Sequence, residues 1–132
     1  MRVMLGLFWV TIAFAQCDDV EVSTKWAKHY SEVVFQGTVV GFRGPENNRN
    51  VVFQVSRVWK GHVGRTFEMP AVQTNGGLCS AFWMGLLAVG NELVVYASRP
   101  IDPNEYLPIR SKTTLVSKAK DLKALGRGHA PE

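Results

Sequence analysis

Alternating hydrophobic and polar positions predict that this chain of 132 residues is built mainly from β-strands. The longest alternation covers residues 51–60, and one face of it carries Val51, Phe53, Val55, Arg57 and Trp59. Trp59 is therefore predicted to share the core face of Phe53. An apolar run at 33–42 precedes this strand, and Gly37 in its middle predicts a bulge or bend. The turn-forming residues between the two runs predict a hairpin.

Three shorter strands and a short N-terminal helix complete the first part of the pattern. The strands are expected at 65–69, 93–98 and 106–109. Pro108 interrupts the last of them, which favours an edge of the sheet. Ser23 is predicted to cap the helix, and its face of Trp26, Ala27 and Tyr30 is expected to lie against an apolar surface.

The C-terminal part of the chain predicts a second helix. Ser117 is expected to cap it and Gly126 to end it, with Ala119, Leu122 and Leu125 pointing inward. Residues 127–132 are expected to form a flexible tail. Five strands with a bent first strand favour a five-stranded OB-fold barrel with a short N-terminal helix and a C-terminal helix, because closure removes exposed strand edges. A β-sandwich is the alternative.

The first 15 residues have the organisation of a cleavable export signal. Arg2 gives a positive start, an apolar run follows, and Ala13-Phe14-Ala15 has the small-x-small pattern that signal peptidase accepts. A membrane span needs about 20 apolar residues, and the run here is shorter. A lipoprotein signal would place a small residue where Gln16 stands. We therefore expect a signal peptide at 1–15 and a secreted or periplasmic protein with no membrane span.

The two cysteines of the chain, Cys17 and Cys79, suit this compartment. Disulfides persist in oxidising surroundings, and small exported domains often depend on them. A disulfide between Cys17 and Cys79 is the prediction from the cysteine count.

Composition and motifs point away from several classes of function. The formal net charge of +4 is mild and the basic residues are scattered, so a nucleic-acid partner is not expected. His29, His62 and His129 are far apart in the sequence and form no metal-binding motif. No nucleophile elbow or phosphate loop is present. Catalysis, a cofactor and a metal site in the free protein are therefore not predicted.

An ordered set of segments resembles a known family. The set consists of Cys17, residues 30–39 (YSEVVFQGTV), residues 53–61 (FQVSRVWKG), Cys79, residues 89–97 (VGNELVVYA) and residues 121–126 (DLKALG). Together they resemble the netrin-like modules. Among these, the chain is most similar to the inhibitory domain of the tissue inhibitors of metalloproteinases, in the compact single-domain form seen in bacteria.

The resemblance implies an OB fold with flanking helices at residues 17–126, and a staple from Cys17 to the loop at Cys79. Members of the family usually open with Cys-x-Cys, and the second cysteine bonds to one near the last strand. Here Asp19 occupies that second position and residues 109–113 contain no cysteine. A whole bridge is therefore missing, and one staple must hold the N-terminal segment.

The resemblance also implies a function. In the metalloproteinase inhibitors the free amino and carbonyl groups of the N-terminal cysteine bind the catalytic zinc of the protease, which needs Cys17 to be residue one. Cleavage after Ala15 leaves Gln16 in front of it, and an N-terminal Gln cyclises to a neutral lactam. Cleavage after Gln16 would expose Cys17 but fits the peptidase less well. Asp18 would also carry its charge into the pocket of the protease.

From these observations we expect an exported protein that acts by protein contact and is not an enzyme. Its expected contact ridge consists of Cys17, Asp18, Asp19, Val20, Leu78 and Ser80. The partner is expected to be an extracytoplasmic protein, with a zinc metalloprotease as the candidate. The alternative is an adhesion or scaffolding module that has no protease target.

Overall fold

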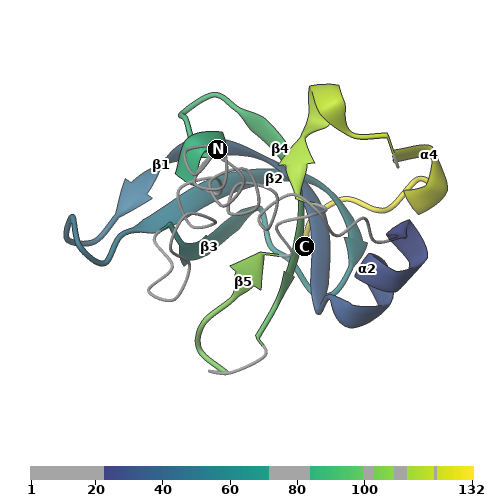
Figure 1. Ribbon diagram of the computed structural model, residues 1–132, viewed down its shortest axis with the longest axis horizontal. Coiled ribbons are helices and arrows are strands. Elements are labelled where there is room, and N and C mark those ends of the chain that lie inside the picture. The colour runs from purple at the N-terminus through teal and green to yellow at the C-terminus, as the bar shows by residue number, and fades with distance from the viewer. Residues whose placement is uncertain (1–22, 72–83, 100–102, 109–112, 121) are drawn as a thin grey trace, which may run out of the picture.

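The computed structural model describes residues 23–71, 84–99, 103–108, 113–120 and 122–132 (Figure 1). These residues form a mainly β structure with short helices. In chain order the elements are α2 (Thr24–Tyr30), β1 (Val33–Arg43), β2 (Asn50–Lys60), β3 (Thr66–Pro70), β4 (Glu92–Ser98), β5 (Leu107–Pro108), β6 (Thr114–Leu115), the 3-10 turn η1 (Val116–Lys118) and α4 (Leu122–Leu125). The predicted strands and the short N-terminal helix are confirmed, and β6 is an addition that the sequence pattern did not indicate.

The strands form one antiparallel sheet in the order β3-β2-β1-β4-β5, with β6 also paired to β4. In a flat sheet of this order β3 and β5 would lie four strand spacings apart, or about 19 Å. The ring of Phe67 in β3 nevertheless lies 5.0 Å from the ring of Tyr106, which directly precedes β5. The sheet is therefore strongly curled, as the arched strands of Figure 1 also show. This confirms the predicted fold class at the level of a curled antiparallel half-barrel.

Bulges between β1 and β2 help to produce the curl. The register skips Ser56 and Trp59 in β2 and Val40 in β1, so each stands as one extra residue opposite the partner strand. Gly37 lies beside the first of these irregularities, as predicted. A Cβ atom at Gly37 would come within 3.2 Å of the Phe35 ring and of the Phe53 Cβ. Glycine at this position therefore lets the two aromatic residues pack closely across the bend.

The bulge at Ser56 also overturns one prediction, the one that placed Trp59 on the core face of Phe53. Phe53 lies in the main core inside the curled sheet. The extra residue shifts the alternation by one position, so Val58 takes the inward place and Trp59 points to the opposite face. There Trp59 is buried, with 8% of its surface exposed, in a second cluster. The other buried members of that cluster are Ala27, Val34, Val94, Tyr96 and Leu125.

The helix α2 covers the second cluster with only part of its predicted face. Ser23 caps it as expected, accepting a hydrogen bond from the Trp26 backbone N–H at 3.0 Å. Ala27 is fully buried, but Trp26 and Tyr30 are 45% and 59% exposed. At 3.6 residues per turn, these two rings lie about a quarter turn or less away from Ala27. The predicted face therefore meets the apolar cluster through Ala27, while about half of each aromatic side chain stays exposed.

The C-terminal region packs on the same side of the sheet as α2 (Figure 1). The predicted inward residues are confirmed, because Leu125 is buried in the second cluster and Ala119 and Leu122 pack against it. Ser117 does not begin the helix as predicted but lies within η1. The expected tail, residues 127–132, lies beside β2. His129 and Val58 exchange two backbone hydrogen bonds of 2.8 Å there. Flexibility of this tail in solution stays a prediction.

Candidate functional site

The residues of the predicted contact ridge lie outside the described residues. This applies to Cys17, Asp18, Asp19, Val20, Leu78 and Ser80, and also to Cys79 and the leader 1–15. The Cys17–Cys79 bridge and the ridge therefore stay predictions. The described residues instead present two neighbouring surfaces, both built around the end of α2.

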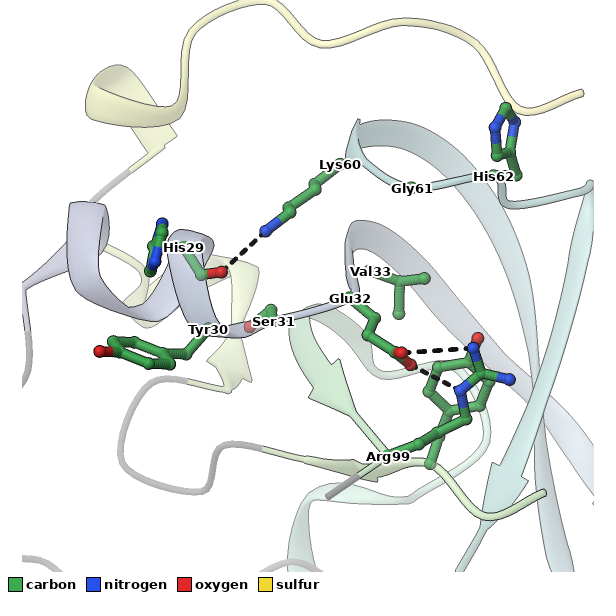
Figure 2. A pocket seen from close by; sticks show the side chains of 10 residues that line it. His29, Tyr30, Ser31, Glu32, Val33, Lys60, Gly61, His62 and Arg99 are labelled. Carbon is green, nitrogen blue, oxygen red and sulfur yellow. Dashed lines mark hydrogen bonds and ion pairs between the residues drawn. The ribbon is translucent and has the colours of Figure 1, made fainter. Parts of the chain in front are cut away.

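The first surface is an open groove of about 540 Å³ where the end of α2, the start of β1 and the turn after β2 meet (Figure 2). Its lining consists of His29, Tyr30, Ser31, Glu32, Val33, Lys60, Gly61, His62, Arg99 and Tyr106. These residues come from four separate stretches of the sequence. The pairing of β1 with β2 and with β4 brings three of them together, and the pairing of β4 with β5 adds Tyr106.

Lys60 joins the end of β2 to the end of α2. Its Nζ donates hydrogen bonds to the carbonyl oxygens of Lys28 at 2.7 Å and of His29 at 2.9 Å. Carbonyl groups at a helix C-terminus lack partners within the helix and carry the negative end of its dipole, so a cation there is favourable. Gly61 follows with φ +84°, and a Cβ at this position would lie 2.5 Å from the Glu32 carbonyl oxygen. Lys60 and Gly61 together therefore fix this wall of the groove.

Arg99 forms the opposite wall. Its guanidinium donates to the Glu32 carboxylate at 2.6 and 3.3 Å and to the Pro103 carbonyl at 3.0 Å. It also lies over the Tyr106 ring, 4.7 Å from the centroid. The hydrogen bond to Glu32 raises the pKa of Arg99 above its ordinary value, so the guanidinium stays charged. Its bonds tie the start of β1 to the segment before β5, which is a structural task.

Two histidines, His29 and His62, line the same groove although 32 residues separate them in the sequence (positions 30 to 61). Sequence spacing gave no signal of this, because the pairing of Val34 in β1 with Lys60 in β2 brings them to one surface. Both are exposed, and His62 Nδ1 lies 3.1 Å from a carboxylate oxygen of Glu132. Within the described part of the chain, no cluster of three or more metal-ligating side chains occurs. The groove therefore presents polar and aromatic groups for contact.

The second surface is the aromatic face of α2, by which we mean Trp26, His29 and Tyr30. The Trp26 and Tyr30 rings lie 4.6 Å apart between centroids, and the His29 ring meets Tyr30 edge-on at 4.9 Å. With Ser23 and Lys25 these side chains line a shallow pocket of about 330 Å³. The spacing of Trp26, Ala27 and Tyr30 predicted a face that lies against an apolar surface, but of these three residues only Ala27 is buried.

Comparison of the chain with models of known protein families, with curated proteins and with solved structures finds no match. None of the helices formed by the described residues is long and apolar enough to cross a membrane.

Proposed function

We propose that this chain is an exported netrin-like domain with an OB-type barrel that acts by contacting another protein. One observation supports the family assignment most: the segments that carry the resemblance coincide with the three central strands of the sheet. Residues 30–39, 53–61 and 89–97 contain residues 33–39 of β1, 53–60 of β2 and 92–97 of β4. Phe35 of β1, for example, pairs with Val58 on one side and with Val95 on the other.

The contacts at the two outer strands support closure of the sheet into a barrel. Phe67 of β3 touches Phe35 of β1 at 4.8 Å and Tyr106 at 5.0 Å between ring centroids. A continuous row of rings thus crosses the interior from the central strand to the segment before β5. In a small barrel, side chains such as these fill the interior. An OB-type barrel is the arrangement that we propose for the whole domain.

The proposed contact surface is the ridge of Cys17 to Val20 with Leu78 and Ser80. Its first part, Cys17 to Val20, precedes α2 in the sequence, and α2 is held at both ends, by the Ser23 cap and by Lys60. Buried Ala27 fixes its middle. The segment that we propose for the cleft of a zinc metalloprotease is therefore joined to a helix that is fixed to the sheet.

The test is inhibition of a matrix-type zinc metalloprotease by two forms of the mature protein, one beginning at Gln16 and one at Cys17. Chelation predicts inhibition by the Cys17 form only, because a lactam at Gln16 leaves no amine for the zinc. Contact through the ridge alone predicts that both forms inhibit. Failure of both forms would remove the protease as target.

An adhesion or scaffolding role is the second candidate, and the exposed aromatic face of α2 favours it. Large aromatic side chains that stay exposed beside basic residues are typical of protein contact surfaces. This face does not belong to the predicted ridge. It could therefore bind a partner whether or not the ridge binds a protease.

A further inference from the structure

We propose that the aromatic face of α2 is a docking site for an acidic segment of a partner protein, with one apolar side chain of that segment entering the shallow pocket that Trp26, His29 and Tyr30 line with Ser23 and Lys25. The site is separate from the predicted N-terminal ridge and does not depend on protease inhibition. Three observations carry it: the rings are not needed for packing, the surface offers donors and positive charge, and the pocket fits a side chain.

The fold holds α2 without using the aromatic rings. Ala27 is fully buried, and the neighbouring Ser31 hydroxyl donates to the Ala27 carbonyl at 2.6 Å. The Ser23 cap and Lys60 secure the two ends. The Trp26 and Tyr30 rings contact each other, and about half of the surface of each side chain is exposed to solvent. Two large rings exposed side by side on one helix therefore indicate a partner.

The chemistry of the face selects an acidic partner. Thr24–Tyr30 contains the bases Lys25, Lys28 and His29 and no acidic residue. Neither the Trp26 indole N–H nor the Tyr30 hydroxyl donates to another described residue. Among the described residues, the acidic one that follows α2 most closely, Glu32, is held by Arg99. Acidic side chains would supply the acceptors and the opposite charge that the described residues of this surface lack.

The shape of the pocket favours a peptide side chain over a sugar. The Trp26 and Tyr30 planes are inclined by 41°, so they do not form one flat platform on which a sugar ring stacks. Together with Ser23, Lys25 and His29 the two rings line a shallow notch. A notch of about 330 Å³ has room for one aromatic or branched aliphatic side chain. Among the described residues, the lining of the notch has no carboxylate or amide group, which could pair with two neighbouring sugar hydroxyls at once. An acidic protein segment is therefore the favoured occupant.

The test uses the exported mature protein and a phage-displayed library of random peptides as the probe. We expect enrichment of peptides that carry an aromatic or branched aliphatic residue flanked by Asp or Glu. Synthetic copies of these peptides should bind the double variant Trp26→Ala/Tyr30→Ala at least about tenfold more weakly, which is the loss typical of interface anchors. Lys25→Glu should weaken binding as well.

Matched controls separate this site from general surface effects. Val89 is an exposed apolar residue in a distant turn and Arg65 is an exposed base at the start of β3, so Val89→Ser and Arg65→Glu should leave binding unchanged. Asp18→Thr should also leave it unchanged, which separates this site from the ridge. Far-UV circular dichroism confirms that the double variant is folded.

Three results would overturn the proposal. The first is that selection on the natural protein enriches no peptide that selection on the double variant does not also enrich. The second is that enriched peptides bind that variant as well as the natural protein. The third is that heparin binds in a Trp26-dependent way while acidic peptides do not, which would assign the face to an anionic polysaccharide.

Discussion

The indole Nε1 of Trp59 donates a hydrogen bond to the carbonyl oxygen of Gly126 at 2.9 Å. This bond joins the bulged end of β2 to the residue that ends α4, across 67 positions of sequence. Trp59 is also buried among residues of α2, β4 and α4. One side chain thus links the sheet to both helices that cover its outer face.

Replacement of Trp59 should strongly destabilise the fold. Trp59→Ala removes a large buried side chain and should lower the free energy of unfolding by about 3 to 5 kcal/mol. Trp59→Phe keeps most of the packing but leaves the Gly126 carbonyl without its donor, so a loss of about 1 to 2 kcal/mol is expected. Urea unfolding measures both. Trp26→Ala is the control, because a change at an exposed position should stay within about 0.5 kcal/mol.

A loss below about 1 kcal/mol for Trp59→Ala would place this side chain outside any core, at the level of ordinary surface substitutions.

The alternation of residues 51–60 predicted the strand but not the face of its last tryptophan. Periodicity assigns faces by counting residues in twos, and the count fails where a bulge inserts an extra residue. The bulge at Ser56 depends on how β2 pairs with β1, which is a property of two strands and is not visible in one. The position of Gly37 did give a correct signal, because glycine is needed where two aromatic residues approach the backbone.

Substitution of Gly61 should weaken the turn that ends β2. The residue has φ +84°, and an added Cβ would come within 2.9 Å of Val33 Cγ1 as well as meeting the Glu32 carbonyl. Gly61→Ala should therefore cost roughly 1 to 3 kcal/mol in unfolding free energy. Gly85→Ala is the matched control, since nothing lies within 4 Å of an added Cβ there. Equal stability of the two variants would contradict the strained geometry assigned to Gly61.

The candidate surfaces were less predictable than the strands. The spacing of Trp26, Ala27 and Tyr30 marks one side of a helix, but it does not say which part of that side meets the sheet. Small Ala27 makes the close contact, and the rings remain outside. His29 and His62 line one groove because the start of β1 pairs with the end of β2. The ridge was predicted from the resemblance and lies outside the described residues.

Removal of the predicted staple should destabilise the mature domain without abolishing the sheet. The loop between Cys17 and Cys79 is long, so the bridge should contribute up to about 4 kcal/mol by limiting the unfolded chain. Cys79→Ser should lower the melting temperature in non-reducing buffer. The natural protein under reducing conditions should fall to the level of the variant. An unchanged melting temperature for Cys79→Ser would show that the bridge is absent or makes no contribution.

The residue after Cys17 tests the chelating version of protease inhibition. In a form that begins at Cys17, Asp18→Thr should strengthen inhibition, because a carboxylate no longer has to be desolvated in the pocket of the protease. An Ala added before Cys17 should abolish chelation in the same assay. Inhibition that is unaffected by the added Ala would exclude the amine as a zinc ligand and point to another edge of the domain.

The central claim is that the chain works as an exported, stapled contact domain. Intact-mass spectrometry of the exported protein, alkylated without reduction, tests the export and the staple in one measurement. The account predicts a chain that begins at Gln16, blocked as the lactam, with neither Cys17 nor Cys79 alkylated. A chain that still begins at Met1 and carries two alkylated cysteines would contradict it.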